Sequence, residues 1–169
     1  MKADVMGLES LPHETLVQLA KMFFKNQRNL DGYWFQYVED EVGTETAVKI
    51  DGKIWTRHAI AEAREIKRIF EIPEEGPPSV MRALTYTLSM ETPEYEVFTP
   101  ERIVLRMTRC PMQEARLKQG RPEFPCREQG LIIYPGIARE IDSRVKVRCL
   151  QCPPDRHPDG FWCRWEYYL

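Results

Sequence analysis

Long apolar runs are absent from this sequence, and so is any excess of charge of one sign. No stretch of about 18 consecutive apolar residues occurs, so the sequence gives no transmembrane helix. The formal net charge at pH 7 is −2, from 24 Lys and Arg against 26 Asp and Glu. Neutralising phosphates requires a basic excess. We therefore expect neither a membrane nor a nucleic acid as a partner.

Several familiar signatures of enzymes are also missing. The sequence contains no Walker loop, GxGxxG, HExxH, GxSxG or EF-hand pattern, so the enzyme classes that these motifs define lose support. Residues 1–7 carry an acid and have no apolar core, which is not typical of a secretory signal. A cytoplasmic location is therefore expected. Disulfides are disfavoured there, and cysteines are more often reduced, metal-ligating or catalytic.

The sequence has an ordinary globular composition, and its expected helices and strands are unevenly distributed along the chain. Hydrophobic residues make up 43% and charged residues 30% of the 169 positions. Helical spacing dominates residues 1–92, whereas alternating apolar residues dominate residues 93–169. This pattern predicts a single α+β domain, 1–169, in which N-terminal helices pack on an antiparallel sheet with two further helices.

The sequence predicts the elements individually as well. The Asp31-Gly32 and Asp51-Gly52 pairs are expected to weaken the first two helices, and Pro135-Gly136 lies inside the last one. The expected helices cover residues 12–42, 45–70, 79–90, 110–119 and 128–141. The expected strands cover residues 94–99, 102–108, 144–150 and 161–169.

All five cysteines fall within the last 60 residues, which makes them the main candidates for chemistry. Cys149 and Cys152 have the x2 spacing of metal ligands, and a hairpin of the last two strands would bring Cys163 close to them. His157, in the loop between these strands, offers a fourth donor, and Cys126 is the alternative if the fold brings it close. Zinc takes four nitrogen or sulfur ligands, so this set is a candidate zinc site, with iron a less favoured metal. Redox-active thiols and inert buried cysteines are the alternatives.

Cys110 is a separate candidate because it lies at a transition from strand to helix. Pro111 after it suits the first helical turn, so the helix dipole, with Arg106 and Arg109 nearby, would stabilise a thiolate. That environment is typical of a catalytic nucleophile. The alternative is a turn cysteine packed beneath the helix.

Acidic and aromatic residues in the first helix form a second candidate feature. Trp34 belongs to its apolar stripe, and Glu39 lies in an acidic run just before the helix ends. Glu39 or His58 is a candidate for proton transfer, and Trp34 for ligand contact. A solvated acidic patch and a surface histidine are the simpler interpretations.

The sheet-forming half is rich in arginine, and some of these side chains could bind a carboxylate with two hydrogen bonds. We expect Arg106 and Arg109, together with Cys126, to line the ligand side of such a site. Arg144 and Arg148 are four residues apart and would share one face of a strand. An exposed, charged sheet face is the alternative.

The cysteine-bearing segments resemble an uncharacterised family of small cytosolic proteins from bacteria and archaea. A more distant resemblance is to the L-2-amino-thiazoline-4-carboxylic acid hydrolase family, through the order Cys110-Pro111, Cys126 and Cys163. This chain departs from it in the Pro-rich stretch 152–160. The order of cysteines in this chain also resembles that of vinyl-reductase-like domains, which bind small molecules. The resembling segments are residues 30–35 with Glu39, 108–116, 124–126, 149–158 and 162–166.

These observations leave three functional hypotheses open. The first is a metal- or small-molecule-binding protein with a cysteine-lined zinc site. The second, implied by the hydrolase resemblance, is hydrolysis of a carboxylate-bearing C–N substrate in which Cys110 acts. The third is an iron–sulfur or haem sensor. A small-molecule ligand or substrate is the expected partner, with a homodimer as an option.

Overall fold

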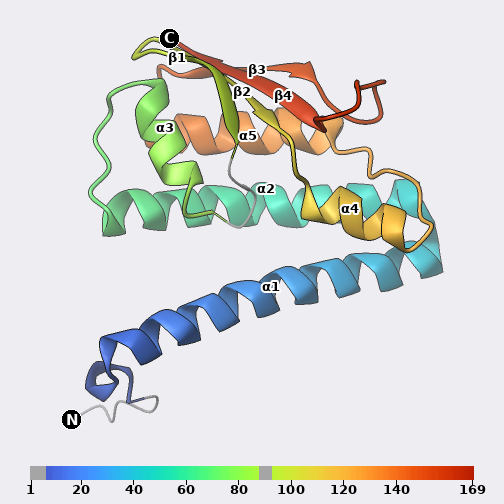
Figure 1. Ribbon diagram of the computed structural model, residues 1–169, viewed down its shortest axis with the longest axis horizontal. Coiled ribbons are helices and arrows are strands. Elements are labelled where there is room, and N and C mark those ends of the chain that lie inside the picture. Colours follow the sequence, from blue (N-terminus) through green and yellow to red (C-terminus); the bar gives the residue numbers. More distant parts are fainter. Residues whose placement is uncertain (1–6, 88–92) are drawn as a thin grey trace. The chain divides into compact units, whose positions relative to one another are not determined.

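The computed structural model describes residues 7–87 and 93–169, which form two compact units, residues 1–44 and 45–169. Each unit is considered on its own, and folding as one domain stays a prediction. Figure 1 shows helices first and then a four-stranded antiparallel sheet, so the α+β class is confirmed. No helix in the described residues is both long and apolar enough to cross a membrane.

The first unit consists mainly of one long helix. A short 3-10 turn, Leu8–Ser10, precedes α1, His13–Val42, which begins after Pro12. Gly43 ends it with a φ of 79°, a conformation that glycine adopts without a steric penalty. The expected weakening at Asp31-Gly32 does not break the helix, because one glycine costs only about 1 kcal/mol in a helix of 30 residues.

The second unit begins at Glu45, the second residue of α2, Thr44–Ile69, and this helix also continues through its glycine at position 52. A side chain there would contact Gln129 at 3.5 Å, and Gln129 donates hydrogen bonds of 2.9 Å to Val48 O and Asp51 Oδ2. Gly52 therefore permits a close approach of two helices. The next helix, α3, Pro77–Leu84, begins two residues earlier than expected and ends at Leu84, and residues 88–90 of the expected helix lie outside the described residues.

Two hairpins make the sheet in the strand order β1-β2-β4-β3. The strands are β1, Glu94–Phe98, β2, Arg102–Met107, β3, Lys146–Gln151, and β4, Cys163–Tyr168. Thr99 closes the first hairpin by two contacts with Arg102: its N–H donates to the carbonyl and its Oγ1 accepts from the N–H. Both sheet-forming hairpins are thus where the sequence predicts them, with ends shifted by one to two residues.

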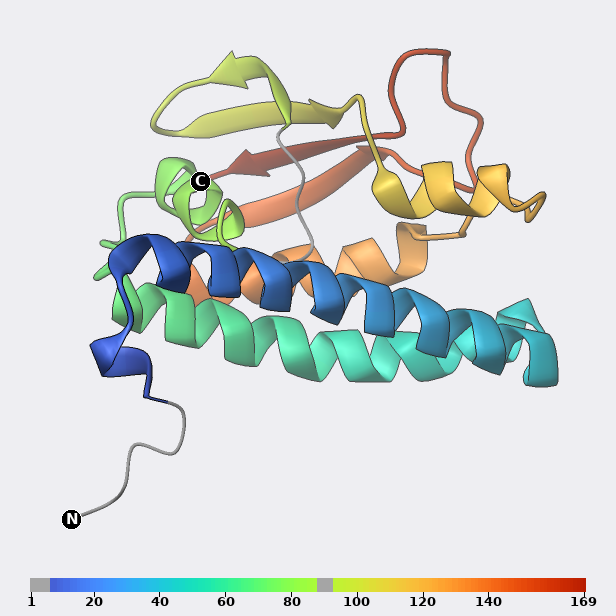
Figure 2. The same ribbon diagram turned by 60° about the horizontal axis from the view of Figure 1, so that its bottom comes forward.

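Helices α4, Pro111–Lys118, and α5, Arg127–Ile141, lie between the hairpins in sequence. In Figure 2 the helix α5 runs beneath the sheet, and α2 lies on the other side of α5. A side chain at Gly130 would meet Trp165 at 2.7 Å, so this glycine lets α5 approach the sheet. Pro135 and Gly136 do not interrupt the helix, and a side chain at Gly136 would meet Ile60 of α2 at 3.3 Å, so close packing against α2 supports this part of the helix.

The core lies between the inner face of the sheet and these helices. Leu105, Trp165 and Tyr167 on the sheet and Leu84 and Ile137 on the helices are almost completely buried. Because side chains alternate along a strand, the residues of β2 and β4 at odd positions form this inner face. The inner face also includes Cys163, which pairs with Met107, so the core continues directly into the cysteine region.

Candidate functional site

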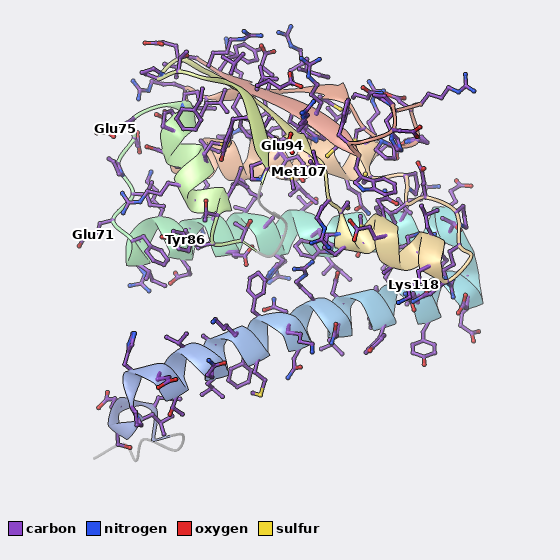
Figure 3. The ribbon with its side chains drawn as sticks, in the orientation of Figure 1. Glu71, Glu75, Tyr86, Glu94, Met107 and Lys118 are labelled. Carbon is purple, nitrogen blue, oxygen red and sulfur yellow. The ribbon has the colours of Figure 1, made fainter. Side chains whose placement is uncertain are left out.

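The five cysteines come from four segments that meet at one end of the sheet. Cys110 precedes α4, Cys126 precedes α5, Cys149 lies in β3, Cys152 follows β3 directly, and Cys163 opens β4. Figure 3 labels Met107 and Lys118, which mark the two ends of the segment that carries Cys110. All five are free thiols. The segments meet here because the hairpin β3–β4 closes above the start of α5.

Cys152 is the thiol around which the others gather. Its Sγ lies 3.3 Å from Sγ of Cys126, and the side chains of Cys149 and Cys163 also interact with it. The backbone fixes this arrangement, since the N–H of Arg127 donates to the carbonyl of Pro153 at 3.0 Å. The structure therefore brings together the three thiols that the hairpin predicts, and adds Cys126 to them.

The thiols of this cluster influence each other's ionisation. The hydrogen bonds that Cys152 makes with Cys126 and Cys163 raise its own pKa far above the ordinary value, because its proton is shared with both neighbours. The same contact lowers the pKa of Cys163, and the indole of Trp165 acts in the same direction. Burial raises the pKa of Cys149, whereas Arg127 opposes that rise. Cys152 is thus a proton donor, and Cys163 favours the thiolate.

Cys110 differs from the expectation of a stabilised thiolate. Burial raises its pKa to about 11, and this outweighs the backbone N–H groups of Met112 and Gln113 at the start of α4. The two arginines do not supply the missing charge. Arg106 lies on the outer face of the sheet and pairs with Glu94 at 2.7 Å, and Arg109 pairs with Glu114 at 3.4 Å. The predicted lowering of the Cys110 pKa is therefore wrong.

Gln113 is a site residue that the sequence pattern does not reveal. It is completely buried, and its side chain makes two hydrogen bonds with the backbone of Phe124, of 2.9 Å and 2.7 Å. The same amide nitrogen lies 3.7 Å from Sγ of Cys126. Gln113 thus fixes the segment that carries Cys126 and points an N–H donor at its sulfur. Only the folded arrangement of α4 and residues 124–126 makes this visible.

Aromatic side chains form the inner wall of the thiol cluster. The Tyr134 and Trp165 rings are 4.7 Å apart in an edge-to-face arrangement. Burial, together with the nearby thiols, raises the pKa of Tyr134 well above its ordinary value. Among the described residues, neither Trp165 Nε1 nor Tyr167 Oη has a hydrogen-bond partner of normal geometry. The cluster therefore lies in surroundings of low polarity, where a thiolate needs a positive partner.

His157 does not join the thiols. Its Nε2 lies 3.3 Å from Glu123 Oε1, its Nδ1 lies 3.3 Å from the carbonyl of Pro158, and its ring packs against Trp162. The loop that carries it is attached to the start of α5, where Arg127 pairs with Asp155, but the His157 ring is engaged by Glu123 and Trp162 and not by a thiol. We therefore replace His157 by Cys126 in the candidate donor set.

The candidates outside the sheet half occupy ordinary helical environments. Glu39 accepts a hydrogen bond of 2.8 Å from Thr44 Oγ1 within the first unit, and Trp34 lies one and a half turns earlier in α1. His58 in α2 lies 4.0 Å from Glu62 Oε1 and contacts the ring of Trp55 edge to face. These contacts give local roles to Glu39 and His58, and the predicted roles in proton transfer and ligand contact stay predictions.

The outer face of the sheet carries the arginines expected there, and the chain's own carboxylates engage them. Glu166 is almost completely buried between Arg102 and Arg148, each of whose Nε atoms donates to it at 2.7 Å. Burial would raise the pKa of Glu166, but the two arginines lower it. Arg144 lies before β3 and pairs with Asp142, so it does not share a strand face with Arg148.

The thiols of the cluster are not arranged as a complete set of metal ligands. Within residues 7–87 and 93–169, no three His, Cys, Asp or Glu side chains are arranged so that they could hold a metal ion. A thiol cluster with one close sulfur pair is what the geometry provides.

The comparisons with known proteins identify a family but no activity. A family model described as "Family of unknown function (DUF6125)" matches residues 9–169. The chain therefore belongs to this family. No curated protein and no solved structure matches the chain.

Proposed function

We propose that this protein, whose family has no assigned activity, binds a soft metal ion through the thiolates of Cys126, Cys149, Cys152 and Cys163. Zinc is the metal we place first. The observation that carries the proposal is the convergence on Cys152 of three thiols from separate segments. Inert cysteines have no reason to gather in this way, whereas sulfur donors around one point are what a structural zinc site requires.

The number and spacing of the donors support this set. Tetrahedral zinc with Zn–S bonds of about 2.3 Å separates neighbouring sulfur atoms by about 3.8 Å. The Cys126–Cys152 separation of 3.3 Å is already close to that value. Because the side chains do not form a ready-made shell, binding requires Cys149 and Cys163 to turn toward the pair. Cys149 lies in β3 and Cys163 opens β4, so the β3–β4 hairpin carries both thiols.

The surroundings of the thiols also suit a bound cation. Zinc binds thiolates, so each ligand must lose its proton, and the metal supplies the positive partner that the apolar wall lacks. Gln113 points an N–H donor at Cys126. Such a donor beyond the ligands typically orients a ligand and tunes the metal affinity. Retention of the metal by free thiols fits a reducing compartment such as the cytoplasm.

Iron is the alternative for the same ligands, because four thiolates also hold iron or an iron–sulfur cluster. The absorption spectrum distinguishes the two metals, since a zinc–thiolate protein is colourless in the visible range. No contact in the described residues favours haem over these options. A small-molecule ligand beside the metal and a homodimer stay predictions.

The hydrolase hypothesis has less support. It needs Cys110 as a thiolate near neutral pH, but burial raises the pKa of this thiol to about 11. The arginines expected to hold a substrate carboxylate, Arg106 and Arg109, pair with Glu94 and Glu114 instead. The similarity to L-2-amino-thiazoline-4-carboxylic acid hydrolases therefore remains a resemblance in cysteine order.

A zinc titration with paired variants tests the proposal. Reduced, metal-free protein is titrated with zinc against a chromophoric chelator, and the released protons are measured in weak buffer. We expect one zinc per chain and a loss of affinity of at least about 100-fold in Cys152→Ser. Cys110→Ser is the matched control, since it removes a neighbouring thiol outside the donor set. Equal affinity in both variants, or none in the wild type, would overturn the proposal.

A further inference from the structure

Cys126 and Cys152, two members of the thiol cluster, lie in direct sulfur–sulfur contact. Their Sγ atoms are 3.3 Å apart, although the residues are 26 positions apart in the sequence. The hydrogen bond from the Arg127 N–H to the Pro153 carbonyl, 3.0 Å, joins the residues that follow each cysteine. Two backbone segments are thus fixed side by side with their thiols facing each other.

The access to the two sulfur atoms is unequal. Cys126 is half-buried, at the start of α5, whereas Cys152 is 2% exposed. Gln113 holds the Cys126 segment from the other side through its two hydrogen bonds with Phe124. A small oxidant therefore reaches Cys126 first, and Cys152 is the buried thiol positioned behind it. This is the arrangement of an attacking and a resolving cysteine.

We propose that Cys126 and Cys152 are a redox pair that closes into a reversible disulfide when a peroxide reaches the site. The consequence for the metal rests on the proposed function: the disulfide takes two of the four sulfur ligands, so oxidation releases the ion. The same cluster would then hold a metal when reduced and lose it when oxidised.

The chemistry balances with hydrogen peroxide as the oxidant. The Cys126 thiolate attacks one peroxide oxygen, an S–O bond forms, the O–O bond breaks, and the leaving hydroxide takes up the thiol proton as water. The Cys152 sulfur then attacks the sulfenic sulfur as its thiol loses its proton, an S–S bond forms, the S–O bond breaks, and the second hydroxide takes up that proton and leaves as water. Two thiols lose two electrons in total, and the peroxide is reduced to two waters. A thiol such as glutathione reverses the step by exchange.

The sequence pattern points to a different pair. Cys149 and Cys152 have the CxxC spacing of redox motifs, so a reading of the sequence places the disulfide between them. Cys149, however, is part of β3 and pairs there with Trp165, whereas Cys152 lies beyond the end of the strand beside Cys126. The folded chain, and not the CxxC spacing, therefore makes Cys126 the partner of Cys152.

Peptide mapping of the metal-free full chain tests the pair directly. The protein is treated with about one equivalent of hydrogen peroxide, its remaining thiols are blocked, and it is digested with trypsin without reduction. Cleavage after lysine and arginine, except before proline, puts Cys126 in peptide 119–127 and both Cys149 and Cys152 in peptide 149–156. We expect these two peptides to be linked, with fragmentation placing the bond at Cys152.

Cys149→Ser is the matched control, because it changes the same tryptic peptide but leaves the proposed pair intact. The link should persist in Cys149→Ser and disappear in Cys152→Ser and Cys126→Ser, with the fold of each variant checked by circular dichroism. A bond within peptide 149–156, or oxidation of Cys126 to sulfinic acid without any link, overturns the proposal. So does a link that survives in Cys152→Ser.

Zinc release separates this inference from the proposed function. Zinc-loaded protein should release one equivalent of zinc for each disulfide formed, and glutathione should restore binding. If the link forms in a protein that binds no zinc, the proposed function fails and the redox pair stands. If zinc binds but peroxide gives no Cys126–Cys152 link, the redox pair fails and the proposed function stands.

Discussion

The two ends of helix α5 carry polar clusters that are built in opposite ways. At its C-terminal end, Asp142 is completely buried, and its carboxylate accepts hydrogen bonds from the Gly76 N–H at 2.9 Å and from the backbone and guanidinium of Arg144. At its N-terminal end, Cys126 meets other thiols, which share protons with each other. The first cluster is electrically complete, whereas Arg127, the cation that acts on Cys149 in the second, is already paired with Asp155.

This difference separates a structural cluster from a candidate functional one. The dipole of α5 disfavours a carboxylate at the C-terminal end, but Arg144 more than compensates, and the pKa of Asp142 is far below its ordinary value. At the other end the dipole favours thiolates, yet burial and shared protons raise the pKa of Cys149 and Cys152. A cation would complete the second cluster as Arg144 completes the first.

The largest change in stability is expected from a substitution in the thiol cluster at the N-terminal end of α5, and only when metal is bound. Zinc-loaded Cys152→Ser should lose about 5 kcal/mol of unfolding free energy relative to zinc-loaded wild type, because loss of a metal site is among the most destabilising changes. Without zinc, the two proteins should differ by about 1 kcal/mol. Urea unfolding with and without zinc measures both differences. An equally large loss without zinc would mean that the thiols act by packing alone.

The second largest loss of stability is expected from a substitution of Asp142, at the C-terminal end of α5, and it should not depend on metal. Asp142→Ala should cost about 3 kcal/mol, since it removes a buried carboxylate that fixes the α3 and α5 ends through Gly76 and Arg144. Urea unfolding measures this loss. Glu140→Ala is the matched control, because its partner Arg64 is largely exposed and solvent screening leaves the pair little effect on stability. Equal losses in the two variants would contradict the structural role of Asp142.

Sequence reasoning anticipates most of this fold and part of the site. The hairpins and the helix after Cys110-Pro111 follow from alternation and turn chemistry. The glycines at positions 32 and 52 and the Pro135-Gly136 pair mislead, because tertiary packing overrides local helix propensity.

The site itself shows where a sequence pattern stops being informative. The gathering of Cys149, Cys152 and Cys163 follows from the closing hairpin, which sets their register. Cys126 joins them, and His157 does not, for reasons that only the course of the chain in space decides. Gln113 has no local signal at all, since its partners lie 11 and 13 residues away.

The third prediction concerns the reactivity of two cysteines near the N-terminal end of α5, Cys163 and Cys110. The pKa of Cys163 is lowered, chiefly by its contact with Cys152, whereas burial raises that of Cys110 to about 11. At pH 8 a thiol with a pKa of about 11 is thiolate in about one molecule in a thousand. Iodoacetamide should therefore modify Cys163 at least about tenfold faster than Cys110 in metal-free protein. Mass spectrometry of peptides 157–164 and 110–116 measures the rates, and a faster Cys110 would restore the case for a nucleophile.

The smallest effect is the pH dependence of stability that Asp142 causes. The folded-state pKa of Asp142 lies below its ordinary value of 3.8, so the unfolded chain takes up a proton first as the pH falls. The stabilisation is fully present above about pH 4 and is lost below it, with a slope of at most about 1.4 kcal/mol per pH unit. Asp142→Asn should flatten the acid limb of the stability curve between pH 4 and 2. An unchanged slope would show that other carboxylates cause it.

Elemental analysis of the protein purified anaerobically, without added metal, tests the central claim most directly. We expect about one equivalent of zinc per chain in the wild type and in Cys110→Ser, and almost none in Cys152→Ser. A wild-type protein that carries no zinc or iron, and whose five thiols all react freely with a thiol reagent, would contradict the metal site.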